Sequence, residues 1–268
     1  MKREELISEI KRKKSFLCVG LDTDINKIPA SLQKEKDPVF AFNKIVIDQT
    51  SDLCVAYKLN AAFYEQNGTS GWESFRKTEE YIPQGIFKIA DAKRGDIGNT
   101  SKQYAKAFFE QMNFDAITVS PYMGYDSISP FMEFENKWVI ILALTSNKGS
   151  LDFQMLRVGD EFLYEKVLKT SSEWGSTGNI MFVVGATHPE AFLPIRQIIP
   201  DHFMLIPGVG AQGGSIDDIG KYALNKDTGV LVNVSRGILF PGDDADFPAN
   251  IKKAALDYQK QMLKWIED

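Results

Sequence analysis

The chain has 268 residues, 44% hydrophobic and 25% charged, a balance that is typical of a folded globular protein and excludes wholesale disorder. Its 31 Lys and Arg against 36 Asp and Glu give a net charge of −5, which argues against a broad nucleic-acid-binding face. Two cysteines exclude a disulfide framework, and two histidines argue against a multi-histidine metal site. We therefore expect a reduced, cytoplasmic chain that holds any anionic ligand in a local pocket.

The first 14 residues predict a short amphipathic helix rather than a targeting segment. Residues 1–14 carry too many charges for the apolar part of a signal peptide, while Leu6, Ile7 and Ile10 recur at helical spacing. The longest apolar run, at 138–144, is far shorter than the ~20 residues of a membrane-spanning helix. We therefore expect a soluble protein with no membrane partner.

Short runs rich in Val, Ile and Phe recur along the rest of the chain. Each run is mostly apolar throughout, as expected for strands that are covered on both faces. The runs lie at 16–22, 53–60, 85–91, 115–120, 138–144, 179–185, 202–208 and 229–235.

Several segments between these strands carry helix start signals. The predicted starts are Asp37 with Pro38, Asn99 or Thr100, Gly159 with Asp160, Thr187 (with a kink at Pro194), Ser215 and Pro248. Strands that alternate with helices, without any linker, predict one (β/α)8 TIM barrel domain over residues 1–268. A doubly wound open sheet would show the same alternation, but such a sheet rarely needs eight strands.

Charged residues lie at the ends of the first three predicted strands, where a barrel places its active site: Asp22, Lys58, Asp91 and Lys93. Asp91 and Lys93 are two residues apart, so an extended strand would direct both to one face, and Asp96 follows in a loop between glycines. A self-contained ion-pair network is the structural alternative. Gathering this many charges in a cleft is costly, however, which favours a functional cluster.

A glycine-rich loop follows the seventh predicted strand. The glycines within 208–213 match the G-x-G-x-x-G spacing of dinucleotide-binding loops, but the next strand ends in Ser235 and Arg236 rather than in a ribose-binding acid. Barrels commonly bind phosphate at the loops after strands seven and eight, and glycines that only turn the chain are the alternative. We therefore expect a phosphorylated small-molecule substrate, with backbone N–H groups at the glycines, Gln212 and Arg236 as anion ligands.

The sequence resembles the orotidine 5′-monophosphate decarboxylase family over almost its whole length. The D-x-K-x-x-D-I-x-x-T signature occupies residues 91–100, and VGAT from Val184, PGVGAQGG from Pro207 and SRG from Ser235 follow in order. The segment SPYMGYDS from Ser120 resembles the longer bacterial, type 2 branch. The resemblance implies decarboxylation of orotidine 5′-monophosphate to UMP and CO2, the final step of de novo UMP synthesis, with no cofactor and no metal.

The resemblance also implies a role for each matched position. Lys93 would donate the proton to C6 of the pyrimidine, and Asp91 would lie beside the departing carboxylate. Asp22 and Lys58 would bind ribose hydroxyls, with Lys58 also in the charged array. The other implied substrate contacts are Ser146 at the pyrimidine ring, Pro207, and the phosphate ligands Gln212, Gly213, Ser235 and Arg236. Asp96 would be a further catalytic residue of the same charge network. A homodimer is implied as well, because three residues would reach into the neighbouring subunit's site: Asp96, Ile97 and Thr100.

Two other functions stay open. Keto-sugar-phosphate decarboxylases and hexulose-phosphate synthases of the same superfamily carry an Asp-x-Lys-x-x-Asp element but use it with Mg²⁺. Lys58 and the residues at 97–100 favour the metal-free enzyme. A non-catalytic phosphosugar-binding barrel would need the phosphate site but not Lys93, so the charged cluster argues against it.

Overall fold

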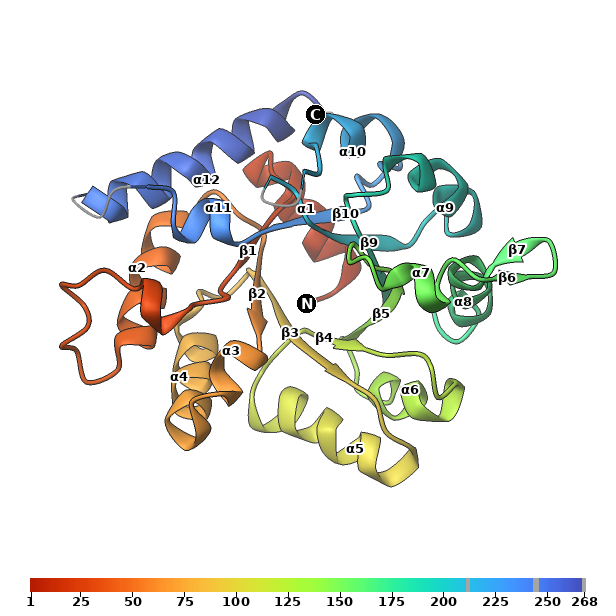
Figure 1. The fold of residues 1–268 in the computed structure, drawn as a ribbon, viewed down its shortest axis with the longest axis horizontal. Helices are drawn as coiled ribbons and strands as arrows, with labels where there is room; N and C mark the ends of the chain where they lie inside the picture. The colour runs from red at the N-terminus through yellow and green to blue at the C-terminus, as the bar shows by residue number, and fades with distance from the viewer. Residues whose placement is uncertain (211–212, 243–245, 267–268) are drawn as a thin grey trace.

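The computed structural model describes residues 1–210, 213–242 and 246–266. Within these residues, eight parallel strands close a barrel in the order β1-β10-β9-β8-β5-β4-β3-β2, with helices around the outside (Figure 1). The barrel strands are β1 (Leu17–Gly20), β2 (Ala56–Asn60), β3 (Phe87–Arg94), β4 (Ala116–Val119), β5 (Trp138–Leu144), β8 (Ile180–Val184), β9 (Phe203–Pro207) and β10 (Val230–Val234). Each coincides with one of the apolar runs, which confirms the (β/α)8 fold.

Helical segments follow every barrel strand and carry the chain back to the start of the next. They are η1 (Ile25–Lys27), α2 (Pro38–Thr50), α3 (Ala62–Glu65), α4 (Gly68–Tyr81), α5 (Gly98–Lys106), the π-helix η2 (Ala107–Gln111), α6 (Tyr125–Met132), α7 (Ser150–Phe153), α8 (Leu163–Ser172), η3 (Pro189–Ala191), α9 (Phe192–Ile198), α10 (Ile216–Tyr222), α11 (Arg236–Leu239) and α12 (Phe247–Leu263). All helices in the described ranges are too short or too polar to pass through a bilayer.

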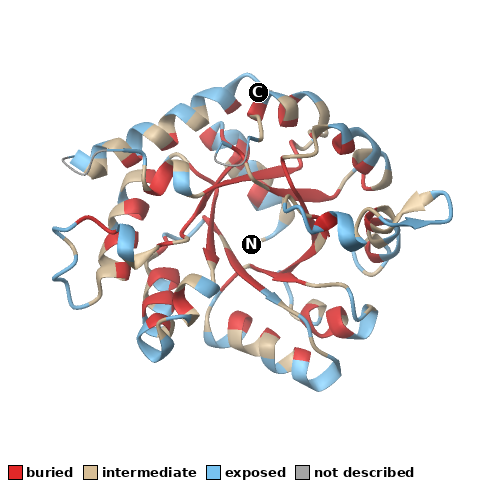
Figure 2. Ribbon diagram, viewed as in Figure 1, coloured by how far each residue is buried: buried red, intermediate tan, exposed pale blue. Residues whose placement is uncertain are grey.

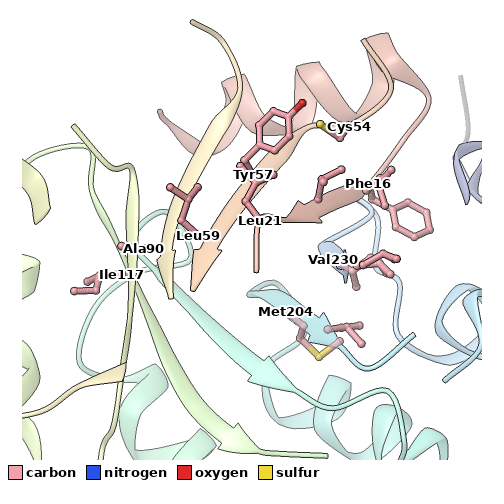
Figure 3. Close-up of a cluster of buried hydrophobic side chains, with 14 of the residues drawn as sticks. Phe16, Leu21, Cys54, Tyr57, Leu59, Ala90, Ile117, Met204 and Val230 are labelled. Carbon is pink, nitrogen blue, oxygen red and sulfur yellow. The ribbon is translucent and has the colours of Figure 1, made fainter. Parts of the chain in front are cut away.

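Alternate side chains of the strands enter two different cores. Leu17 and Val19 of β1 pack in the outer core between strands and helices, whereas Cys18 packs inside the barrel. Figure 3 shows part of the outer core, where Tyr57 and Leu59 of β2 lie among side chains of other strands. The strands are therefore buried along most of their length, while the helices expose their outer faces (Figure 2).

The N-terminal helix α1 (Arg3–Lys13) closes one end of the barrel. Its buried residues Leu6 and Ile10 belong to the interior core together with Phe87, Trp138 and Phe203. Those three aromatic residues are the first residues of β3, β5 and β9. The closed end is thus the end where the strands begin, and the carboxyl ends of the strands form the open mouth.

Helix boundaries agree with the start signals in some places and differ in others. Asp37 caps α2 by accepting a hydrogen bond from the Phe40 amide at 3.1 Å, and Ser215 caps α10, both as predicted. The predicted helix start at Gly159 and Asp160 is wrong. Gly159 has a φ of +67° and lies in the turn of a hairpin, β6 (Arg157–Val158) and β7 (Glu161–Phe162), and α8 begins only at Leu163.

Two smaller boundary predictions also need correction. Helix α5 begins at Gly98, ahead of the predicted start at Asn99 or Thr100. Helix α9 begins at Phe192, so Pro194 lies in its first turn, where the missing N–H has no helical partner and no interior hydrogen bond is lost. Helices α3, α4 and α6 were not predicted, and each begins without a side-chain cap.

Candidate active site

Strand alternation brings charged side chains into the open mouth of the barrel. On β2, Lys58 follows Ala56 of the interior core, and on β3, Asp91 follows Ile89 of the same core. Lys58 pairs in register with Ile89, which places it one inward position below Asp91 on the neighbouring strand. The interior of the barrel therefore changes from apolar to charged as the strands reach their carboxyl ends.

Asp91 is the centre of a hydrogen-bonded ion cluster. Its Oδ2 accepts from Lys58 Nζ at 2.9 Å, and its Oδ1 accepts from Lys93 Nζ at 2.6 Å. Lys58 Nζ also reaches Oδ1 of Asp22 at 3.4 Å. The structure thus brings together the four charged residues that the sequence analysis expected at the first three strand ends.

Burial and charge act in opposite directions on this cluster. Burial disfavours the charged form of Lys58, but the neighbouring Asp22 and Asp91 outweigh it and raise the pKa of the ammonium above its usual value. Burial likewise disfavours ionised Asp91, but Lys58 and Lys93 outweigh it and hold the pKa of that carboxyl well below its usual value. Lys58 and Asp91 are buried, whereas the Lys93 side chain is 49% exposed and faces the mouth. A ligand in the mouth would meet Lys93 first.

A cavity of about 600 Å³ opens above the cluster, within the size range of small-molecule sites. Eight of the residues predicted for the site line it: Asp22, Lys58, Asp91, Lys93, Ser146, Pro207, Ser235 and Arg236. Apolar side chains from three strands on the far side of the barrel also line it: Leu142, Val183 and Leu205. The cavity therefore combines a charged wall with an apolar one.

The cavity is also bounded by Ser235 and Arg236, which directly follow β10, the barrel strand next to β1. The Ser235 hydroxyl is buried and has no hydrogen-bond partner among the described residues. Gly20 allows β1 to pass close to it, because a Cβ at that position would lie 2.9 Å from the Ser235 Cβ. A buried hydroxyl beside a guanidinium is a suitable arrangement for an anionic oxygen.

The remaining predicted residues do not line this cavity or cannot be placed. Asp96, Ile97 and Thr100 lie outward of β3, around the start of α5, and Ile97 is 59% exposed. Gly213 has a φ of +91°, a left-handed conformation that favours glycine, but it is not among the described lining residues. Gln212 lies outside the described residues.

The backbone conformation that brings the Asp91 and Lys93 side chains together is not the extended strand that was predicted. The register of β3 against β4 shifts between Ala90 and Arg94, and Lys93 has a φ of +47°. A regular extended strand therefore does not set their relative position. A bulge ends the regular strand at Asp91 and turns the Lys93 side chain back toward that carboxylate.

Sequence reasoning missed two buried polar residues of the cavity wall. Thr118 of β4 and Asn233 of β10 occupy inward positions, after Ala116 and Leu231 of the interior core. Each is a polar residue within an otherwise apolar strand, AITV and VLVNV. That break in the apolar pattern, at an inward position near the carboxyl end, was a signal that could have identified both.

Among residues 1–210, 213–242 and 246–266, no group of three or more His, Cys, Asp and Glu side chains is arranged to hold a metal ion. Within the cavity, the carboxylates of Asp22 and Asp91 are the side chains best suited by their chemistry to bind a cation. The position between their carboxylates is taken by the Lys58 ammonium, which contacts both.

Comparisons with known proteins point to one family. A family model described as Orotidine 5'-phosphate decarboxylase / HUMPS family matches residues 15–246. The orotidine 5'-phosphate decarboxylase of Bacteroides fragilis (strain YCH46) is 54% identical over 271 residues, covering 100% of this chain and 99% of that protein. The structure of Leishmania donovani OMP decarboxylase is similar with a TM-score of 0.84 and 40% identity, over 98% of this chain and 99% of that chain. Leishmania donovani UMP synthase is similar over 98% of this chain with a TM-score of 0.86 and 41% identity, and this chain spans 57% of its length.

Proposed function

Because the chain belongs to the orotidine 5′-phosphate decarboxylase / HUMPS family, we propose that it converts orotidine 5′-monophosphate to UMP and CO2, the final step of de novo UMP synthesis. The observation that carries this proposal is Asp91, held between Lys58 and Lys93 at the floor of the cavity. A carboxylate fixed beside an ammonium suits a reaction in which a carboxylate group leaves as CO2 and the carbon that carried it then needs one proton. No metal or cofactor takes part in the proposed reaction.

Lys93 is the proton donor in this proposal. The bond between C6 of the pyrimidine and its carboxylate breaks, CO2 leaves, and the electron pair remains on C6. The Lys93 ammonium stabilises that charge from a fixed position and then transfers its proton to C6, and solvent returns a proton to the amine. Asp91 lies beside the departing carboxylate and holds Lys93 in place through the 2.6 Å contact.

The rest of the cavity binds the nucleotide. In this proposal Asp22 and Lys58 contact the ribose hydroxyls, and Ser146 and Pro207 contact the pyrimidine ring and its surroundings; all four residues line the cavity, which supports these roles. The phosphate binds beyond the end of β10, against Arg236 and the buried Ser235 hydroxyl, with Gln212 and Gly213 as its further proposed ligands. Binding energy from this remote phosphate orients the reacting ring and excludes water from it.

The active form in this proposal is a homodimer. Asp96, Ile97 and Thr100 lie outside the cavity of their own subunit, and the apolar side chain of Ile97 is largely exposed. Both facts are accounted for if these residues enter the site of a neighbouring subunit. The proposed location is the cytoplasm, where the two free, buried thiols of Cys18 and Cys54 stay reduced.

One assay tests this function against the Mg²⁺-dependent alternative. We expect purified protein to convert orotidine 5′-monophosphate to UMP at the same rate with and without EDTA. The loss of substrate absorbance measures this rate. Lys58 between the two carboxylates is the reason to expect no dependence on a divalent cation.

A folded protein that leaves orotidine 5′-monophosphate unchanged would contradict the proposal. Turnover of a keto-sugar phosphate that requires added Mg²⁺ would assign the chain to the metal-dependent branch. Binding of phosphosugars without turnover of either substrate would identify a binding protein.

A further inference from the structure

Thr118 of β4 lies opposite the irregular end of β3, where the pairing register shifts between Ala90 and Arg94. Its neighbours Ile117 and Val119 pack in the outer core, so the Thr118 side chain faces the interior, where it is 1% exposed. It also lines the cavity that contains Lys93. A buried hydroxyl at this position needs hydrogen-bond partners, and the structure supplies two.

The first partner is the backbone of Lys93. Ala90 pairs with Ile117 and Arg94 pairs with Val119, so residues 91–93 of β3 face Thr118 alone. The amide of Lys93 donates to Thr118 Oγ1 at 2.9 Å instead of to a strand carbonyl. Since Lys93 has a φ of +47°, which is unfavourable for a residue with a side chain, this bond holds a strained backbone in place.

The second partner is the side chain of Asp91. Thr118 Oγ1 donates to Asp91 Oδ1 at 2.9 Å, and the same carboxylate oxygen accepts from Lys93 Nζ at 2.6 Å. The hydroxyl therefore donates its one proton in a hydrogen bond to Asp91, and its oxygen accepts a hydrogen bond from the Lys93 amide. Its two bonds fix both the backbone of Lys93 and the carboxylate that orients the Lys93 ammonium.

We propose that Thr118 is a positioning residue for proton transfer, which sets the place of the Lys93 ammonium through the Asp91 carboxylate and the Lys93 amide. The inference rests on the proposed role of Lys93 as proton donor. A small displacement of a reacting group can cost about 10²-fold in rate, so the hydroxyl matters for turnover rather than for nucleotide affinity. A residue that only fills the core would act through its volume, and its hydroxyl would be dispensable.

Two variants of the full chain separate these roles. Thr118→Val has nearly the same shape but lacks the hydroxyl, and Thr118→Ser keeps the hydroxyl but lacks the methyl group. We expect Thr118→Val to lower kcat and kcat/KM together by about 10- to 100-fold, with unchanged affinity for UMP. Thr118→Ser should retain most of the wild-type kcat. If Thr118→Val does not fold, Thr118→Ala replaces it, because the smaller side chain removes the hydroxyl without a clash.

Hydrogen–deuterium exchange across residues 87–94 gives a readout that needs no turnover. We expect faster exchange at the Lys93 amide in Thr118→Val and wild-type protection in Thr118→Ser. Equal kcat in Thr118→Val and wild type, or equally low kcat in Thr118→Val and Thr118→Ser, would overturn the inference. If the wild type does not convert orotidine 5′-monophosphate, the proposed function fails, and unchanged exchange in Thr118→Val would separately overturn the role of Thr118 at the bulge.

Discussion

At the scale of single residues, Asp91 concentrates the electrostatics of the site. Three donors converge on its two carboxylate oxygens: Lys58, Lys93 and Thr118. Removal of one partner of a buried ion pair typically costs about 3–5 kcal/mol, because the other charge is left uncompensated. The cluster therefore maintains a buried negative charge that an apolar cavity floor could not hold, and the proposed chemistry depends on that charge.

A buried histidine lies at the opposite end of the barrel. His202 is 9% exposed, and both of its ring nitrogens lack hydrogen-bond partners among the described residues. It packs edge-on against Phe182, with ring centroids 5.5 Å apart. Burial and, to a lesser degree, the positive charges of Arg3 and Arg196 lower the pKa of the imidazole to about 4. The negative charge of Asp201 acts in the opposite direction but is the smaller effect.

From the lowered pKa of this histidine, we expect the free energy of unfolding to decrease as the pH falls. Its unfolded-state pKa of about 6.5 lies above the folded value, so the unfolded chain binds the proton more readily. The stabilising contribution is therefore complete above about pH 6.5 and is lost as the pH falls toward 4. Between pH 7 and pH 5, we expect wild type to lose about 2 kcal/mol more of its free energy of unfolding than His202→Leu loses. Urea titrations at both pH values measure this, and equal losses in the two proteins would refute the prediction.

At the scale of secondary-structure elements, the barrel strands could be predicted because each is buried on both faces. The run from Trp138 to Leu144, for example, is apolar throughout, and every residue of β5 except Leu142 is buried. The hairpin β6–β7 could not be predicted, because its residues are exposed or half-buried and its Gly159–Asp160 turn resembles a helix start. Helix α4 was not predicted, and in the structure its N-cap residue Asn67 makes no side-chain capping hydrogen bond.

The candidate site was predictable only in part, for a similar reason. Asp22, Lys58 and Asp91 follow from strand ends and the two-residue alternation of strand side chains. The bulge at Lys93 depends on a hydrogen bond to Thr118, which lies 25 positions along the chain. Pairing between residues so far apart leaves no local pattern in the sequence.

The end of β10 predicts a phosphate-specific effect for Arg236. Arg236→Ala should weaken binding of orotidine 5′-monophosphate by about 10- to 100-fold, since a charge-assisted hydrogen bond contributes about 1.5–3 kcal/mol. Binding of the nucleoside orotidine should change little, because it lacks the phosphate. Because active protein would convert orotidine 5′-monophosphate, the substitution is made in a Lys93→Ala background, where equilibrium titration of both ligands measures the two effects.

A matched control removes an arginine elsewhere. Arg76 lies exposed on α4 and pairs with Glu80 at 2.5 Å, away from the cavity, so Arg76→Ala in the same background should leave the affinity for both ligands unchanged. Equal losses for nucleotide and nucleoside in Arg236→Ala would place the phosphate elsewhere.

At the scale of the whole molecule, the two ends of the barrel have separate roles. Helix α1 fills the end where the strands begin, with Leu6 and Ile10 inside the barrel core, and the charged cluster occupies the opposite end. The cavity is therefore a one-sided pocket rather than a channel. The segment that contains Asp96 and Ile97 follows β3 and does not line this cavity, and Ile97 is largely exposed.

A shared site predicts that two inactive variants restore each other. In a heterodimer of Asp96→Ala with Lys93→Ala, one site combines an intact Lys93 with an intact Asp96 from the other subunit. Mixing equal amounts under conditions that exchange subunits should recover about a quarter of wild-type turnover, because half the dimers are mixed and each has one working site. Activity that stays at the level of the separate variants after mixing would show that both residues act within one chain.

The most direct test of the account is the kcat of Lys93→Ala for orotidine 5′-monophosphate, measured together with its affinity for UMP. Lys260→Ala, which removes an exposed lysine on the outer helix α12, serves as the control and should have wild-type kcat. Loss of the proton donor should lower kcat by at least about 10²-fold while the protein stays folded and still binds UMP. A Lys93→Ala protein that retains kcat within about tenfold of wild type would contradict the assignment of Lys93 as proton donor.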